Sequence, residues 1–217
     1  MEENLRNAWT QIIVADELDD HLDDLGQAKI NAQIVNEMLN DYKLPRDSKI
    51  LMPGCGTGQI FDYLSPDLCK NYNLTFTDIN QSFLNKLSER LSLYCVLRYR
   101  CLLDDIEETN IFETFDGIIP VLVLEQLEWE KAIDTLVNYN PQFLYLIIQE
   151  QSCNTQTITV NVKSRDSIRK FSEMANPQLV PRNELIKRLG LKNYKLCSIY
   201  ERDVPNNKQM VGLVFSK

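Results

Sequence analysis

Apolar and polar positions follow two different periods along this chain of 217 residues. From about residue 27 to residue 42, apolar side chains recur every three or four positions, which predicts an amphipathic helix. From Lys49 onward, short and nearly continuous apolar runs alternate with helical patterns. Such runs are typical of strands that are buried on both faces of a parallel sheet.

This pattern predicts five strand–helix units that are closed by a terminal β-hairpin. The predicted strands cover residues 49–54, 73–79, 95–103, 115–124 and 142–150. The predicted helices cover residues 59–68, 81–91, 127–139, 167–174 and 181–191, the last with Pro181 at its start and Gly190 at its end. Residues 194–203 and 209–217 flank a Pro-Asn-Asn turn and predict two antiparallel strands.

The length predicts a single domain over residues 1–217. Residues 1–45 would form an N-terminal helical cap, and residues 46–217 an α/β core. Within the core, residues 151–180 are polar and irregular, and we interpret them as a candidate lid.

Composition narrows the functional class. The formal net charge of −8 argues against nucleic acid as a partner, which usually requires a basic surface. No apolar run is long enough for a membrane span, and the N-terminus lacks the pattern of a secretion signal. Six scattered cysteines and a single histidine predict no metal site and favour a cytoplasmic location.

The strongest motif is the segment MPGCGTGQ at residues 52–59, directly after the first predicted strand. Its glycines allow a tight turn and let a ligand approach the backbone closely. Counted from Gly54, the sixth position is Gln59, so the dinucleotide-binding fingerprint does not match. The lysine of a phosphate-binding P-loop is also missing.

An acidic residue, Asp78, ends the second predicted strand, 20 positions after Gly58. In α/β folds of this kind, a carboxylate at this place binds the two ribose hydroxyls of a nucleoside. A turn or capping role is the alternative for an isolated Asp, but the glycine loop favours the ribose.

Together these motifs resemble the class I S-adenosylmethionine-dependent methyltransferases. The resemblance runs from about Lys49 to the C-terminus and rests on MPGCGTG, TFTDIN, LLDDIEET, FDGIIPVLVLEQLEW and the terminal hairpin. It implies a Rossmann-like α/β fold with a seven-stranded, mostly parallel sheet, helices on both faces and an antiparallel C-terminal hairpin. It also implies S-adenosylmethionine as the cofactor and S-adenosylhomocysteine as the product.

The resemblance assigns the cofactor's amino-acid end to the glycine loop. The loop residues concerned are Gly54, Cys55, Gly56 and Gly58. Asp78 would hold the ribose, and Ile79 would pack on the adenine.

Further along the chain, Asp105 would accept a hydrogen bond from the adenine amino group, beside the Ile106 backbone. Asp104 competes for this role, since two successive aspartates leave the register open by one position. Pro120 and Val121 would line the methionine side.

Two positions depart from the family pattern. Met52 stands where the family often has an acidic residue, so the cofactor's ammonium group needs another partner. Gln126 stands where the family often has a histidine, which leaves the identity of a base open.

Candidate acceptor-site groups follow the fourth and fifth strands, since ligands of open α/β sheets bind at the carboxyl ends of strands. These candidates are Glu125, Gln126, Gln149 and Glu150. Trp9 could stack on an aromatic acceptor or belong to the core.

His21 is the candidate base, because it is the single histidine and its ordinary pKa lies near neutrality. The alternative is an exposed histidine on an acidic helix face. Flanking aspartates would then favour its charged form, which works against a base.

The sequence therefore predicts a methyltransferase that acts on a small molecule by in-line displacement, mainly through proximity and orientation. A protein or RNA methyltransferase, or a partner-binding module without catalysis, are the alternatives. The acceptor atom, whether oxygen, nitrogen or carbon, and the oligomeric state stay open.

Overall fold

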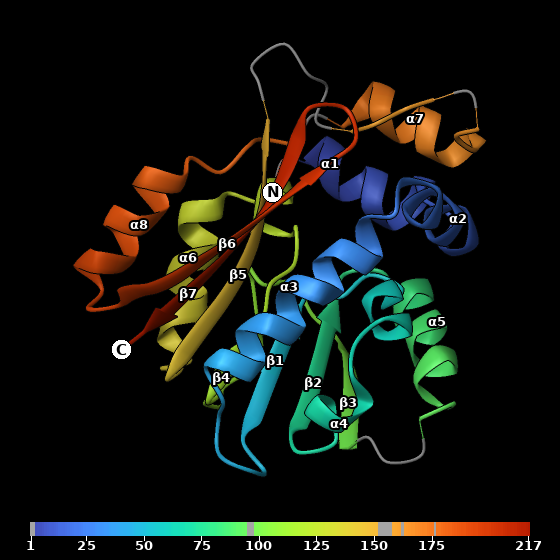
Figure 1. Ribbon diagram of the computed structural model, residues 1–217. Helices are drawn as coiled ribbons and strands as arrows, with labels where there is room; N and C mark the ends of the chain where they lie inside the picture. The colour runs from blue at the N-terminus through green and yellow to red at the C-terminus, as the bar shows by residue number, and fades with distance from the viewer. Residues whose placement is uncertain (1–2, 95–97, 152–157, 162, 176) are drawn as a thin grey trace.

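The computed structural model describes residues 3–94, 98–151, 158–161, 163–175 and 177–217. A seven-stranded sheet forms its centre, with strand order β3-β2-β1-β4-β5-β7-β6 (Figure 1). The strands are β1 (Lys49–Pro53), β2 (Asn73–Asp78), β3 (Arg98–Leu103), β4 (Gly117–Ile118), β5 (Phe143–Gln151), β6 (Lys195–Val204) and β7 (Lys208–Ser216). Strands β1 to β5 are parallel, and β7 pairs antiparallel with both β5 and β6. The predicted sheet and C-terminal hairpin are therefore confirmed.

Helices lie on both faces of this sheet and above one end of it (Figure 1). The longer ones are α2 (Ala15–Leu25), α3 (Gln27–Asp41), α5 (Gln81–Leu91), α6 (Trp129–Asn138), α7 (Asp166–Met174) and α8 (Arg182–Leu191). The short ones are α1 (Glu3–Asn7), the π-helix η1 (Ala8–Ile12), α4 (Pro66–Cys69), and the 3₁₀ helices η2 (Gln59–Asp62) and η3 (Leu124–Gln126).

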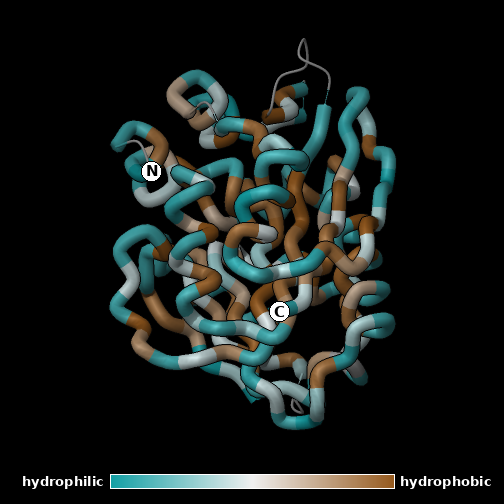
Figure 2. The backbone as a smooth tube through the Cα atoms, turned by 90° about the vertical axis from the view of Figure 1, so that its left-hand side faces the viewer, coloured by the Kyte–Doolittle hydropathy of each residue, from teal (hydrophilic) through white to brown (hydrophobic). Residues whose placement is uncertain are grey.

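Each face of the sheet has its own hydrophobic core, because successive side chains of a strand point to opposite faces. In β1, Ile50 and Met52 pack with α3 and α5, whereas Leu51 packs with α6 and α8. In Figure 2 the hydrophobic segments gather along the central strands. Within the described residues, no helix is long and apolar enough to cross a membrane.

Two predicted elements differ from the structure. The sequence predicts the fourth strand over residues 115–124, but β4 contains two residues and only an isolated bridge, Val121 to Ile147, follows it. Pro120 lacks a backbone donor and Leu122 has a φ of 54°, so the ladder cannot continue. The predicted helix over residues 59–68 is divided into η2 and α4, with Pro66 at the start of α4.

The ends of two other elements also need adjustment. Gly190 lies inside α8 and does not end it; the left-handed residue after the helix is Asn193, with a φ of 67°. The third predicted strand begins at residue 95, and its residues 95–97 lie outside the described part of the chain.

Segments from distant parts of the sequence form a cap over the carboxyl ends of the strands. We call α1, η1, α2 and α7 the cap (Figure 1). The Ser167 backbone N–H donates to Glu17 at 2.9 Å, and the Val14 N–H donates to the Ser167 hydroxyl at 3.3 Å. The predicted lid segment thus contributes one helix, α7, to the same layer as the N-terminal segment. Residues 152–157, 162 and 176 of that lid lie outside the described residues.

Candidate active site

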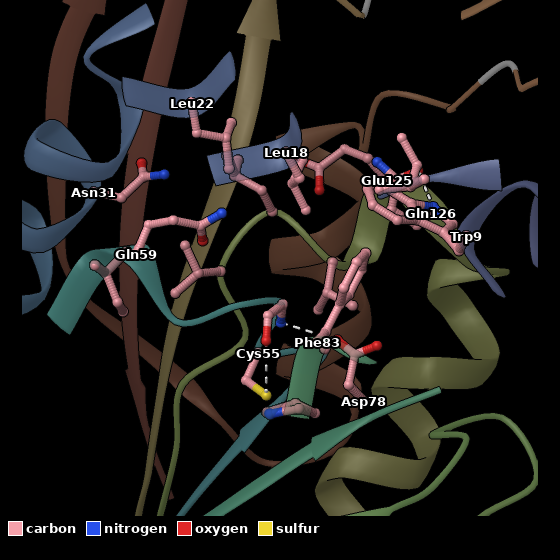
Figure 3. Close-up of a pocket in the computed structure, with 18 of the residues that line it drawn as sticks. Trp9, Leu18, Leu22, Asn31, Cys55, Gln59, Asp78, Phe83, Glu125 and Gln126 are labelled. Carbon is pink, nitrogen blue, oxygen red and sulfur yellow. Dashed lines mark hydrogen bonds between the residues drawn. The ribbon is translucent and has the colours of Figure 1, made fainter. Parts of the chain in front are cut away.

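A cavity of about 260 Å³ lies between the cap and the carboxyl ends of the central strands (Figure 3). It combines an apolar lining with a few buried polar groups, which is typical of small-molecule sites. Of the residues predicted for the site, those that line it are Trp9, His21, Gly54, Cys55, Gly56, Asp78, Ile79, Asp104, Asp105, Ile106, Val121, Glu125, Gln126 and Gln149.

The glycine loop after β1 needs its glycines for different reasons. Gly54 has a φ of +58°, and a Cβ there would lie 2.2 Å from Val123 Cγ2. Gly56 has a φ of +55°, and a Cβ there would meet Gln59 Oε1 at 3.9 Å without a clash. The Gly56 backbone N–H donates to Asp78 Oδ2 at 2.9 Å. The loop therefore presents bare backbone to the cavity, as a close approach by a ligand requires.

Asp78 ends β2 and is 7% exposed. Its Oδ1 accepts from the Asn80 N–H at 2.9 Å, so backbone donors hold both carboxylate oxygens. Burial raises the pKa of Asp78 to about 6, although these backbone donors oppose the shift. The carboxylate is thus fixed in orientation and keeps further lone pairs for hydroxyl donors.

The two neighbouring aspartates after β3 both line the cavity but have different partners. Asp105 accepts from the Glu107 N–H at 2.9 Å and forms an ion pair with Arg6 of α1. Asp104 accepts from the Asn110 N–H at 3.1 Å. Both remain candidates for an adenine contact, and the Arg6 pair shows that the cap reaches this edge of the site.

On the side of the cavity away from Trp9 and Gln126, two buried polar atoms have no hydrogen-bond partner among the described residues (Figure 3). They are Asn31 Oδ1 on α3 and Gln59 Nε2 on η2, and both side chains are drawn in Figure 3. Their residues are 4% and 6% exposed, so solvent does not compensate them. One is an acceptor and the other a donor, which suits an amino acid's ammonium and carboxylate groups.

Glu125 on η3 is the most deeply buried carboxyl of the site, at 3% exposure. Its Oε1 accepts from the Gln149 backbone N–H of β5 at 2.7 Å, whereas its Oε2 has no partner among the described residues. Burial raises the pKa of Glu125 to about 7. The group can therefore exist in either protonation state near neutral pH.

Trp9 and Gln126 close the cavity beside Glu125 (Figure 3). The indole N–H of Trp9 donates to Gln126 Oε1 at 3.1 Å. The Trp9 ring packs edge-on against Phe171 and Phe83, with centroid distances of 4.6 and 6.2 Å. Trp9 therefore belongs both to the cap's core and to the cavity wall, so the two alternatives for this residue are compatible.

His21 lies on the inner side of α2 and is 7% exposed, contrary to the alternative of an exposed residue. Burial lowers the pKa of His21, and the charge of Lys208 acts in the same direction, while Asp24 opposes them. The flanking aspartates thus do not determine its state. The neutral imidazole that a base requires is the favoured form.

Three predicted residues lie outside the cavity lining. Gly58 faces Leu87 of α5, and Pro120 accepts a backbone bond from Ile147 at 3.0 Å. Glu150 forms a two-point pair with Arg182, with both N–O distances 2.7 Å. The structure therefore does not support an acceptor contact for Glu150, because its carboxylate is committed to α8.

The sequence did not reveal how the cap is attached to the glycine loop. The Thr57 hydroxyl donates to Asp19 of α2, and Arg90 of α5 pairs with the same carboxylate at 2.8 Å. Arg90 also pairs with Asp62 at 3.0 Å and donates to the Thr57 carbonyl. No local signal identifies these partners, because they lie 28 to 71 positions apart.

Comparison with known proteins identifies the central part of the chain. The model of a family described as "Methyltransferase domain" matches residues 51–140, which include the glycine loop, Asp78 and Glu125. Residues 51–140 thus carry the sequence pattern of a methyltransferase domain. The prediction from the sequence motifs is thereby confirmed.

Solved structures extend this fold over nearly the whole chain. Magnesium protoporphyrin IX methyltransferase from Synechocystis PCC 6803, with bound S-adenosylhomocysteine, aligns with a TM-score of 0.68 at 15% identity, over 99% of this chain and 93% of its own. The plantazolicin methyltransferase BpumL aligns with a TM-score of 0.69 at 13% identity, over 99% and 94%. An S-adenosylmethionine-dependent methyltransferase from Clostridium acetobutylicum aligns with a TM-score of 0.66 at 14% identity, over 93% and 98%. These likenesses concern the fold. A search among curated protein sequences gave no match.

Proposed function

We propose that this methyltransferase uses S-adenosylmethionine to methylate a small molecule that binds under the cap. The observation that carries the proposal is the pairing of the bare glycine loop with Asp78 at one end of the cavity. A nucleoside with a charged amino-acid tail needs both features, since its ribose requires a carboxylate and its tail a close backbone approach.

The residues present fit this cofactor along the length of the cavity. Asp78 would bind the ribose hydroxyls, with Ile79 beside the adenine and Asp104 or Asp105 at its amino group. Asn31 Oδ1 would accept from the ammonium group and Gln59 Nε2 would donate to the carboxylate. These two orphaned atoms supply what Met52 cannot, because a thioether is a weak acceptor and carries no charge.

When bound, the cofactor supplies an electrophilic methyl group on a sulfonium. The chain's own contribution is to orient the acceptor in line with that methyl and to exclude water. The apolar cap residues exclude water, and Glu125, Gln126 and Gln149 offer polar contacts to the acceptor. His21 would accept a proton from the acceptor, a role that its buried, neutral form supports.

Several observations favour a small molecule over a protein or RNA acceptor. The cavity is covered by the cap, and the chain's net charge is −8. Two of the similar structures belong to enzymes named for magnesium protoporphyrin IX and plantazolicin. The cysteines that the structure describes, at 55, 69, 101 and 197, are free thiols, which supports our proposal of a cytoplasmic location.

Calorimetric titration with S-adenosylmethionine, with NAD and ATP as controls, tests the proposal. We expect saturable binding of S-adenosylmethionine alone. No binding, with NAD or ATP bound instead, would refute it. A folded protein that binds none of the three would favour a partner-binding module on the same fold.

A further inference from the structure

Glu125 provides a hydrogen-bonding atom that nothing in the described chain uses. Its Oε2 has no partner, although the residue is only 3% exposed. A buried polar atom without a partner costs free energy, so such an atom at a cavity wall indicates a ligand group that completes it. Gln126 differs in this respect, because its oxygen is bound by the Trp9 indole.

The carboxyl of Glu125 is also fixed in place. The Gln149 N–H binds Oε1 at 2.7 Å, and the Gln178 N–H donates to the Glu125 carbonyl at 2.9 Å. Strand β5 and the segment before α8 therefore hold both the side chain and the backbone. A rigid group needs no reorganisation when it meets a substrate, which is the requirement for selective recognition.

The surroundings of Glu125 restrict the charge of what can bind beside it. The described residues that line the cavity include four carboxylates and no lysine or arginine; the carboxylates are Asp78, Asp104, Asp105 and Glu125. A second negative charge placed against a buried carboxylate would find no lysine or arginine among these lining side chains to balance it. An acceptor that reacts through its own carboxylate is therefore disfavoured.

The cap, together with Phe83 of α5, gives the rest of this region an apolar and aromatic wall. The residues that form it are Trp9, Ile13, Leu18, Leu22, Phe83, Ile168 and Phe171. Such a wall favours the binding of an apolar molecule that carries a ring, because contact with a strongly polar molecule would add no hydrophobic stabilisation.

We propose that the methyl acceptor is an apolar, ring-bearing molecule whose hydroxyl or amine group donates a hydrogen bond to Glu125 Oε2. Glu125 is then the residue that selects donor-bearing acceptors over carboxylates. This inference rests on the proposed function, because it concerns the acceptor half of the same cavity.

The test uses three probes that share one ring system and differ in one substituent. They are naphthol, methoxynaphthalene and naphthoate, each substituted at the same ring position. Each is titrated by calorimetry, slightly above neutral pH, into protein saturated with S-adenosylhomocysteine, which carries no methyl to transfer. The first titration, with S-adenosylhomocysteine alone, tests the proposed function separately.

For the unmodified protein we expect naphthol to bind about tenfold more tightly than methoxynaphthalene, the ratio expected of one hydrogen bond to a charged group. Naphthoate should bind more weakly still. In Glu125→Gln, the new amide oxygen can still accept from Gln149, so the fold is retained, but naphthol should lose its advantage and naphthoate should gain affinity. Glu130→Gln, on the exposed side of α6, is the matched control and should leave all three affinities unchanged.

Equal binding of naphthol and methoxynaphthalene to the unmodified protein would overturn the inference, whatever the variant does. So would an unchanged order of affinities in Glu125→Gln. If S-adenosylhomocysteine binds and none of the three probes does, the apolar acceptor is refuted while the proposed function stands. If S-adenosylhomocysteine itself does not bind, the proposed function fails first.

Discussion

Replacing Glu125 by glutamine should change how the stability of the protein depends on pH. Burial raises the pKa of Glu125 from its ordinary value of 4.5 to about 7 in the folded protein. Protonated Glu125 is therefore tolerated in the fold, and its stabilising contribution is lost as the pH rises through about 7. Glutamine has the same shape and does not titrate.

The size of this change in stability follows from the linkage between proton binding and unfolding. Each pH unit over which the folded state keeps the proton and the unfolded state has lost it changes the free energy of unfolding by about 1.4 kcal/mol. The measured series runs from about pH 5.5, which lies above the sequence pI of about 4.8, to about pH 8.5. Within it, the folded protein keeps the proton that the unfolded protein has lost between about pH 5.5 and the folded pKa of about 7, which is roughly one and a half pH units. The free energy of unfolding of Glu125→Gln minus that of the unmodified protein should thus rise by about 2 kcal/mol.

Urea unfolding at a series of pH values measures this difference directly. All other titrating groups are shared by the two proteins, so they cancel unless they couple to residue 125. Glu130→Gln reports the effect of losing one exposed carboxylate and is subtracted. Parallel stability curves for Glu125→Gln and the unmodified protein would show that the Glu125 carboxyl ionises as it does in water, and the argument from its orphaned Oε2 would then fail.

Three further changes test other parts of the site. Asp78→Asn places an amide donor near the Gly56 N–H. It should weaken the binding of S-adenosylmethionine, measured by calorimetry, at least tenfold. An unchanged affinity would contradict the ribose role of Asp78. Gly54→Ala should abolish that binding and destabilise the protein more than Gly26→Ala does. Both glycines have a positive φ, but only at Gly54 would the added Cβ lie 2.2 Å from Val123 Cγ2. Similar losses of stability in both variants would refute the steric argument. The unmodified protein should lose stability as the pH falls below about 6.5, because the fold favours the neutral imidazole of His21. His21→Gln should make this loss smaller when the free energy of unfolding in urea is measured at a series of pH values. An equal loss in the variant and the unmodified protein would contradict this burial effect.

The sheet could be predicted because its information is local. Apolar runs such as residues 143–148 and the glycines after β1 specify strands and turns without reference to distant residues. The same local reading failed after β4, where Leu122 adopts a left-handed backbone that its own side chain does not favour. Apolar residues continue past that point in the sequence, so the periodicity extends the predicted strand as far as Leu124, the first residue of η3.

The chemistry of the site was less predictable than its position. Glu125 was a candidate because it follows a strand, but its burial depends on Gln149, Gln178 and the cap. His21 lies among aspartates in the sequence, yet its environment is set by packing and by Lys208, 187 positions later. Long-range contacts of this kind determine protonation, and no window of sequence contains them.

The position of β7 has a consequence for how the chain can fold during synthesis. The last strand lies between β5 and β6, where it pairs with β5 over nine residues. Until residues 208–216 have left the ribosome, the apolar strand β5 keeps an open edge, and β6 has no partner strand in the sheet. Open apolar edges template aggregation, so the nascent protein is most vulnerable while β5 and β6 are made and β7 is still missing. Chaperones that cover exposed strands would act on this methyltransferase at that moment.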